Sequence, residues 1–512
     1  MSSIYKMLDG TTNIYTIDHR GTGRSFFLNC RAAQAFTTGS PGREDIDFLE
    51  FPNCFKDVLF QIDNQTAAFS VTSAAKDVEY VIDNINNETD VYVYGSSYGT
   101  YLAERVMHLA PSQVRGYILD GVVSEVRPTF ATLSSDRIPV GEYYASLCEK
   151  DPHCSSKYAY GIKEYGDLHS AWVSTFKKLD SLKSCANIVA SNEFGSKPSA
   201  ILREIVSGLP PKPLSADMPL PPLEVIPALF KMLDRCEQDD IAALRGLFQL
   251  QANDTLQSGW ERLTSSTESP SQSLNEVTAG SPLLTNLLTA SELWTFPSVS
   301  QDDEIKKMED GIFAVDTTSD YALFCMFNGD WKDPSCPSLI RYGKQMKPAR
   351  DFSNIPLSQF RYTRDEYFHK VAKIPRNASV MVMNGKLDFQ TVFSGAKEQY
   401  EKMEGAAKLL VEFPYAGHCP GLNEVCGTTI IASFLRNGGS VNATNTSCVA
   451  TLPAPNFDMD TYIKSRLAPA GSNSSTSGPN AIDVRSAAVD RLTCSSGLVP
   501  MILTVFAASI LL

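Results

Sequence analysis

The 512-residue sequence contains no run of Lys or Arg and no segment in which basic and aromatic residues alternate. The formal net charge is −13, which excludes nucleic acid and anionic membrane surfaces as expected partners. The chain also lacks a Cys-x-x-Cys pair and any Cys/His cluster with metal-ligand spacing. No metal or cofactor is therefore expected, and 43% hydrophobic residues suffice for a large buried core.

The two ends of the chain differ in apolar content. The first residues have neither the basic nor the apolar region of a signal peptide. Residues 498–512 are apolar but short for a membrane span, and they follow a polar spacer at 489–497 and the small residues 486–488. This is the layout of a GPI-attachment signal, with a tail anchor or an apolar terminus as the alternative. We therefore expect an extracellular or cell-surface protein with a C-terminal lipid anchor, whose signal peptide precedes this chain.

Cysteines and glycosylation motifs favour the same compartment. The twelve cysteines are dispersed and include the close pairs Cys148/Cys154 and Cys325/Cys336, a pattern that favours disulfides over a metal. Seven Asn-x-Ser/Thr motifs begin at Asn64, Asn87, Asn253, Asn377, Asn442, Asn445 and Asn473. Together these features predict a disulfide-bonded glycoprotein of the secretory pathway.

A strand, a tight turn and a helix are predicted in succession over residues 90–103. The turn is Gly-Ser-Ser-Tyr-Gly at 95–99, and its small flanking residues permit a strained central residue. Ser97 is then raised at the C-terminal end of a strand, above a helix N-terminus that can bind an oxyanion. The pattern predicts a nucleophilic serine.

Ser97 requires a base and an orienting carboxylate from later in the chain. Asp388 directly follows the apolar strand predicted at 379–384, and His418 follows the next strand, at 408–413. The order Ser, Asp, His is that of the α/β-hydrolases. The other five histidines are interpreted as structural, and Cys419 as a disulfide or packed thiol rather than a nucleophile. Asp365 is the alternative acid.

The glycine-rich turn at residues 18–25 follows a short predicted strand at 13–18. It lacks the Gly-x-Gly-x-x-Gly spacing of a nucleotide site, so we interpret it as a structural turn beside the catalytic strand. Strands and helices alternate up to residue 124, stop over a mainly helical segment with Pro-rich turns, and resume near residue 372. The predicted units are the first half of the core (1–124), a helical cap (125–371), the second half of the core (372–455), a flexible stalk (456–488) and the GPI-type signal (489–512).

Several ordered motifs resemble those of the prolyl- and tripeptidyl-aminopeptidase family of α/β-hydrolase serine peptidases. They are Asp-His-Arg-Gly-Thr-Gly-Arg-Ser at 18–25, Gly-Ser-Ser-Tyr-Gly-Thr-Tyr-Leu-Ala at 95–103, Leu-Asp-Gly-Val at 119–122, Gly-Lys-Leu-Asp-Phe-Gln-Thr at 385–391 and Gly-His-Cys at 417–419. The resemblance covers roughly residues 12–124 and 375–455.

The resemblance implies an α/β-hydrolase fold, with a mostly parallel sheet, helices on both faces and a large inserted helical cap. It implies Ser97 as nucleophile, His418 as general base and acid, Asp388 as its orienter and the Tyr98 amide as one oxyanion donor. It also makes Cys426 and Cys448 a pair.

The family carries a His-Gly-Gly-Pro-Gly segment before the Asp-x-Arg-Gly turn, and this chain starts at about the strand that precedes that turn. The first strands of the fold are therefore expected to be missing here. Family members also bind the substrate's amine with cap carboxylates, for which Asp330 is the candidate.

The leading hypothesis is a serine hydrolase that removes N-terminal residues or short peptides through an acyl-enzyme, with a peptide as its partner. An esterase on the same fold is one alternative. The other is a catalytically inactive surface-binding protein, because the oxyanion segment is absent from this chain.

Overall fold

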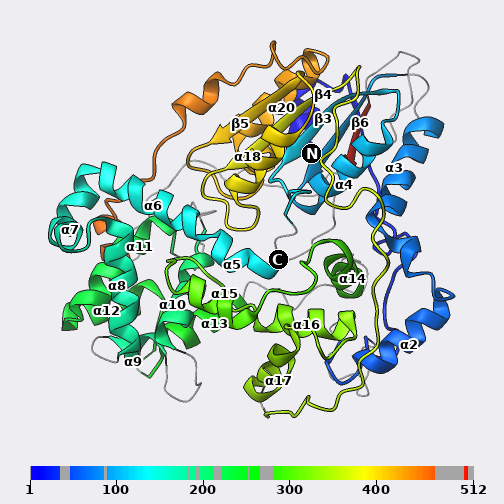
Figure 1. Ribbon diagram of the computed structural model, residues 1–512. Helices are drawn as coiled ribbons and strands as arrows, with labels where there is room; N and C mark the ends of the chain where they lie inside the picture. Colours follow the sequence, from blue (N-terminus) through cyan, green and yellow to red (C-terminus); the bar gives the residue numbers. More distant parts are fainter. Residues whose placement is uncertain are drawn as a thin grey trace, which may run out of the picture.

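The computed structural model describes residues 2–34, 46–85, 89–127, 130–181, 185–190, 197–210, 221–251, 253–265, 281–346, 348–467 and 501–505. Its centre is a parallel sheet of six strands in the order β1-β6-β2-β3-β4-β5 (Figure 1). The strands are β1 (Asn13–Thr16), β2 (Val91–Ser96), β3 (Val114–Asp120), β4 (Ser379–Gly385), β5 (Lys408–Phe413) and β6 (Met501–Val505). The predicted strands at 379–384 and 408–413 are confirmed, as is the parallel sheet.

Side chains of the central strands alternate between two apolar layers, as the pleat of a strand requires. Val93 and Leu119 belong to one layer, and Tyr94 and Ile118 to the other. The first layer is covered by α3 (Val71–Ile85), α4 (Tyr98–Leu109) and α18 (Phe393–Lys402). The second is covered by α1 (Ser2–Met7) and α20 (Val425–Arg436). A sheet with helices on both faces is the predicted α/β architecture.

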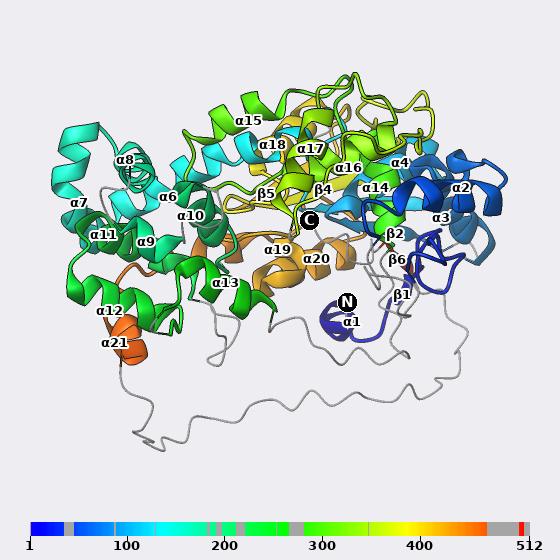
Figure 2. The same ribbon diagram turned by 90° about the horizontal axis from the view of Figure 1, so that it is seen from below.

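The polypeptide between β3 and β4 is a long helical insertion, as predicted (Figures 1 and 2). Its helices are α5 (Leu133–Asp136), α6 (Ile138–Lys150), α7 (Pro152–Tyr165), α8 (Leu168–Asp180), α9 (Ala186–Val189), α10 (Pro198–Ser207), α11 (Ile226–Arg235), α12 (Gln238–Leu247), α13 (Leu256–Ser265), α14 (Pro282–Glu292), α15 (Gln301–Met308), α16 (Thr318–Asn328) and α17 (Cys336–Gln345). Side-chain caps mark several helix starts, because an Asp or Ser oxygen accepts an otherwise free N–H. Asp151 does so for α7, Asp167 for α8 and Ser281 for α14.

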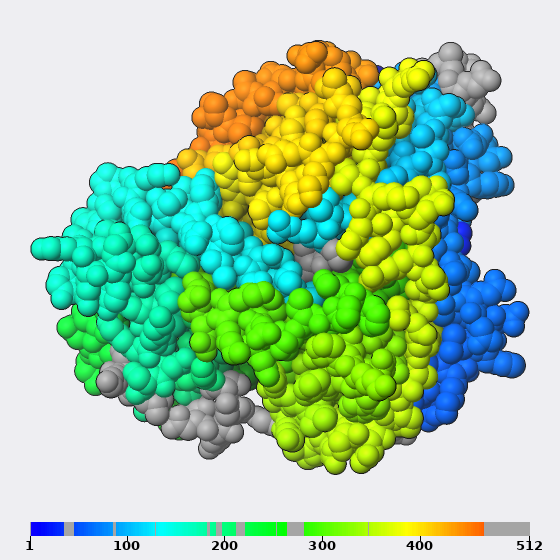
Figure 3. Space-filling view, viewed as in Figure 1, coloured from blue at the N-terminus to red at the C-terminus, as the bar shows by residue number. Residues whose placement is uncertain are grey.

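The insertion divides between two apolar clusters. Helices α6–α12 enclose a cluster of their own, which includes Trp172 and Phe230. Helices α14, α16 and α17 instead share the cluster of α3, α4 and the sheet, through residues such as Leu287 and Phe327. In the space-filling view, the cyan start of the insertion lies between the yellow part of the core and the green residues of α15 and α16 (Figure 3). The α14–α17 part is therefore packed as a continuation of the core.

Three segments outside the sheet complete the described fold. Helix α2 (Phe51–Gln61) packs its Phe51 and Phe55 rings on Phe327 of α16. Helix α19 (Pro420–Asn423) precedes α20, and α21 (Asp460–Leu467) packs on α12. Helix α21 falls within the segment predicted to be a stalk, because Phe457 and Met459 are buried against the cap and hold the chain there. The described part of the predicted GPI-type signal is β6, which lies in the sheet between β1 and β2 instead of extending from the fold. The rest of that signal, and most of the stalk, lies outside the described residues.

Disulfides join Cys148 to Cys154, Cys185 to Cys236, Cys325 to Cys336 and Cys426 to Cys448. The two close pairs and the pair implied by the resemblance are thus confirmed. Cys30, Cys54 and Cys419 are buried free cysteines. Among the described residues, no helix combines the length and the apolar content that crossing a membrane requires.

Candidate active site

Ser97 occupies the strained turn that the sequence predicts. Its φ of 54° and ψ of −127° place a non-glycine residue in a rarely populated conformation, between the end of β2 and the first residue of α4. A Cβ atom on Gly95 would lie 2.2 Å from the carbonyl oxygen of Gly99, so only glycine fits there. The Ser97 carbonyl accepts hydrogen bonds from the Thr100 N–H at 2.9 Å and the Thr100 hydroxyl at 2.7 Å. The turn therefore holds Ser97 at the carboxyl end of the sheet.

Asp388 and His418 meet at the same edge. His418 Nδ1 lies 2.9 Å from Asp388 Oδ2, and the Asp388 side chain is fully buried. The other carboxylate oxygen, Oδ1, accepts the N–H groups of Gln390 and Thr391 at 2.8 Å each. The Thr391 hydroxyl donates to Oδ2 at 2.8 Å. Four hydrogen bonds therefore fix the orientation of the Asp388 carboxylate, as is required of a group that orients an imidazole.

The charge balance around His418 favours its protonated form. Burial lowers the pKa of His418, but the charge and hydrogen bond of Asp388 and the charge of Asp120 raise it by more, so the net pKa lies above 6.5. Because Nδ1 faces Asp388, Nε2 is the nitrogen left for proton transfer.

The serine turn and the histidine loop share a contact at the end of β3. The Asp120 carbonyl accepts the Ser97 N–H at 2.9 Å and the Cys419 thiol at 3.4 Å. Next to it, a Cβ atom on Gly121 would lie 2.9 Å from Cys419 Sγ and 3.1 Å from His418 Cε1. Among the described residues, no hydrogen bond joins the Ser97 hydroxyl to His418. Such bonds are often long before substrate binds.

Cys419 is an unsuitable nucleophile in this setting. Burial raises the pKa of its thiol, and the charges of Asp120 and Asp388 raise it further, so the reactive thiolate is disfavoured. This agrees with the prediction of a packed thiol.

The Tyr98 amide is at the N-terminus of α4, where the first N–H groups of a helix have no intrahelical acceptor. The Tyr98 ring is buried, and its hydroxyl lies 3.2 Å from Nε2 of His19. Burial lowers the pKa of His19, which favours a neutral structural histidine. The turn at 18–25 therefore packs beside the serine turn, as predicted.

Asp330 lies at an exposed turn just after the C-terminal end of α16, where its carboxylate accepts the N–H of Lys332. Asp320 is in the first turn of the same helix, about 12 Å along the axis from its last residue, Asn328, at 1.5 Å per residue. The two acids therefore lie at opposite ends of α16.

The charge of Asp320 acts on Arg137, and so does the charge of Asp388. Arg137 Nε donates to the carbonyl of Phe389, the residue after Asp388, at 2.8 Å. The Asp320 side chain is exposed to solvent, but protein atoms crowd one side of it and partly remove its hydration, which raises its pKa above the ordinary value. The charge of Asp316 adds to this effect, and Arg137 opposes it. Neither Asp320 nor Arg137 was predicted, because only the packing of the cap on the 388–391 loop brings Arg137 within reach of the charges of both Asp388 and Asp320.

A charged cluster lies under the serine helix. Arg105 of α4 forms a fully buried ion pair with Glu292 at 2.7 Å. Glu292 also accepts the hydroxyls of Tyr101 at 3.1 Å and Tyr362 at 2.7 Å. This network fastens α4 to α14 and to the 348–378 segment.

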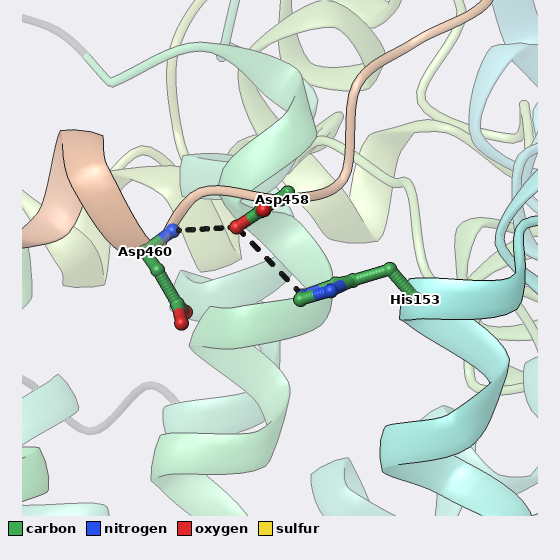
Figure 4. A group of neighbouring side chains, drawn as sticks. All are labelled: His153, Asp458 and Asp460. Atoms are coloured by element: carbon green, nitrogen blue, oxygen red, sulfur yellow. Dashed lines mark hydrogen bonds and ion pairs between the residues drawn. The ribbon is translucent and has the colours of Figure 1, made fainter.

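A separate group with metal-ligand side chains lies in the cap. His153 of α7 faces Asp458 and Asp460 of the segment that leads into α21 (Figure 4). Their ligand atoms all lie within 4.8 Å of one another, but both carboxylates are exposed and His153 Nε2 is 3.9 Å from Asp458. Exposed acidic groups gather in this way without an ion, and we assign none.

Residues 358–448 match the family of TAP-like proteins. The match includes β4, β5, Asp388, His418 and the Cys426–Cys448 disulfide. It does not include the N-terminal half of the core, where Ser97 lies. No curated protein matches the chain. With its fold and this match, the chain resembles the tripeptidyl-aminopeptidase-like family of the α/β-hydrolase superfamily, as the sequence predicts, and the family indicates a hydrolase.

Proposed function

We propose that the protein is a serine peptidase that releases N-terminal residues or short peptides through an acyl-enzyme. The observation that supports this most is the buried Asp388–His418 pair at the sheet edge where the strained Ser97 turn lies. These are the three groups that acyl transfer needs, carried by the loops that an α/β-hydrolase uses for them.

In the proposed reaction, His418 Nε2 takes the proton of Ser97 Oγ as the oxygen attacks the scissile carbonyl. Asp388 remains ionised and holds the imidazolium through Nδ1. The Tyr98 N–H stabilises the oxyanion at the start of α4. The imidazolium then protonates the leaving amine, and water hydrolyses the acyl-enzyme by the same proton transfers in reverse order.

The test is labelling of the full chain with a fluorophosphonate probe, which reacts with activated serines. Labelling is expected in the wild-type protein and in Ser96→Ala, a matched control that removes the neighbouring hydroxyl. It should be lost in Ser97→Ala and fall by at least about 10³-fold in His418→Gln. Labelling that persists in both Ser97→Ala and His418→Gln would refute the assignment.

For the exopeptidase specificity, we infer that a cap carboxylate pairs with the substrate's amine. Asp320 supports this better than Asp330, because Arg137 links its surroundings to the loop that carries Asp388. Asp320→Asn should raise KM for peptides with a free N-terminus and leave N-acetylated esters unaffected, while Asp330→Asn should change neither. A higher kcat/KM for acyl esters than for peptides, insensitive to blocking of the N-terminus, would favour an esterase instead.

We also propose that the protein is an extracellular glycoprotein with a C-terminal lipid anchor. Four disulfides fit an oxidising compartment. The acceptor asparagines within the described residues are all exposed: Asn64, Asn253, Asn377, Asn442 and Asn445. Removal of N-glycans should increase the gel mobility of the protein expressed in a eukaryotic host, and a phospholipase specific for phosphatidylinositol should release it from cells. A protein that neither enzyme affects would contradict this localisation.

A further inference from the structure

Asp120, the last residue of β3, contacts both loops that carry the proposed catalytic groups. Its backbone carbonyl accepts the Ser97 N–H and the Cys419 thiol. Its side chain is fully buried and uses both carboxylate oxygens. Oδ2 accepts the Tyr94 hydroxyl at 2.6 Å, and Oδ1 accepts the Gly421 N–H at 2.9 Å. One residue therefore joins the serine strand to the segment that follows His418.

The approach of the histidine loop to this carboxylate is close. A Cβ atom on Gly421 would lie 2.6 Å from Asp120 Oδ2, so a larger residue there would push the loop away. The loop turns at Cys419, whose φ of 51° is in the left-handed region. The hydrogen bond from the Cys419 thiol to the Asp120 carbonyl stabilises this turn. The distance between the serine turn and the histidine loop is thus set through Asp120.

The Asp120 carboxylate also acts on His418 through its charge. That charge adds to the effect of Asp388 in raising the pKa of His418. Burial raises the pKa of Asp120 itself to about 6, although the bonds from Tyr94 and Gly421 and the charge of His418 work against this, and Asp388 adds to it. The titratable groups that face Asp120 are Tyr94 on β2, His418 and Cys419 on the histidine loop, and Asp388 after β4.

We propose that Asp120 is a positioning residue that holds the serine turn and the histidine loop in register and stabilises the imidazolium of His418 through its negative charge. This rests on the proposed function of Ser97 and His418. It goes beyond the Ser-His-Asp group, because it assigns a second buried carboxylate to the proton balance of the base.

The first test is Asp120→Asn in the full chain. Asparagine keeps the shape and an oxygen for the Gly421 N–H. It removes the charge and puts an NH2 group where Oδ2 accepted the Tyr94 hydroxyl, so that the Tyr94 oxygen becomes the acceptor in this contact. The midpoint of the acid limb in the pH profile of fluorophosphonate labelling should fall by about one unit. The matched control is Asp90→Asn, which should leave the pH profile unchanged. Asp90 directly precedes the first residue of β2, at the end of the strand away from Ser97, and its exposed carboxylate pairs with Arg115.

A second readout does not depend on activity. The imidazole of His418 can be titrated by NMR in the protein with labelled histidine, because the chain has only six histidines and His418→Gln identifies the signal. The titration midpoint should fall in Asp120→Asn by the same amount as the labelling midpoint. A protein that is not labelled at Ser97 would refute the proposed function, and the NMR titration would still decide the role of Asp120.

Tyr94→Phe provides a milder variant if Asp120→Asn does not fold. Loss of the Tyr94 hydroxyl makes protonation of Asp120 easier, so the midpoint of His418 should move in the same direction by a smaller amount. Unchanged His418 midpoints in both variants, with labelling reduced only in proportion to the folded fraction, would overturn the proposal.

Discussion

Replacing Gly95 with alanine tests whether the close packing of β2 against the first turn of α4 keeps Ser97 in its reactive position. The new Cβ atom would lie 2.2 Å from the Gly99 oxygen, 2.5 Å from the Gly99 carbonyl carbon and 2.8 Å from the Thr100 nitrogen. All three are backbone atoms, so no side-chain rotation relieves the contact. Since ordinary contact begins at 3.4 Å, the first turn of α4 must move away from β2 by about 1 Å.

This displacement has two expected consequences. Overpacking of this kind costs about 1–3 kcal/mol of unfolding free energy, and a shift of about 1 Å at a reacting group lowers the rate about 10²-fold. Chemical denaturation and the rate of fluorophosphonate labelling, corrected for the folded fraction, measure the two effects.

Gly395→Ala is the matched control. Its Cβ atom would approach only the Ser124 Cβ, at 3.8 Å, inside helix α18. Alanine is the better helix former by up to about 1 kcal/mol, so this variant should be as stable as the wild type or more stable, and be labelled at the same rate. If Gly95→Ala were also as stable and as reactive as the wild type, the reasoning about the turn would be wrong.

Three further predictions concern charged groups. Asp388→Asn should lower kcat/KM by about 10³–10⁴, measured on a peptide substrate, because His418 loses the acceptor that fixes its tautomer. In the wild type, kcat/KM should rise with pH through a midpoint above 6.5, since the proton must leave His418 before it can act as a base. The raised pKa of His418 also stabilises the folded protein below pH 6.5, and this stabilisation is lost as the pH rises through the pKa of His418 in the folded state. Arg105→Met should cost about 3–5 kcal/mol in denaturation, because it leaves Glu292 charged and buried, while Lys373→Met, at an exposed pair, should change stability by less than about 0.5 kcal/mol.

The parts of the fold that sequence reasoning predicted are those with a local cause. The strand at 408–413 is predicted with its observed bounds, because an apolar run with clear turn signals decides it. The apolar spacing at residues 71, 75, 78, 82 and 85 coincides with α3, and a short 3-10 helix at Thr66–Phe69 precedes it because Ser70 adopts an extended conformation between the two. The division of the cap into two clusters has no local signal, because it depends on which helices reach the sheet.

The same distinction applies to the site. Ser97, Asp388 and His418 each follow a strand, so their common edge is a consequence of a parallel sheet and could be predicted from chain order. Asp120 is the last residue of a strand, but its role arises from a tyrosine on β2 and the Gly421 N–H, which meet it only when β2, β3 and the histidine loop pack together.

Asp320 depends on the fold in the same manner, because helix α16 approaches the loop after β4 through contacts of the cap rather than through any feature of residues 318–328. Phe313, just before that helix, packs on Phe389 with ring centroids 4.3 Å apart, next to the Arg137 bond to the Phe389 carbonyl. These contacts hold Arg137, which feels the charges of both Asp388 and Asp320, against the loop that carries Asp388. For the proposed binding of a substrate amine, Asp320 is therefore the preferred carboxylate, and Asp320→Asn and Asp330→Asn test this preference separately.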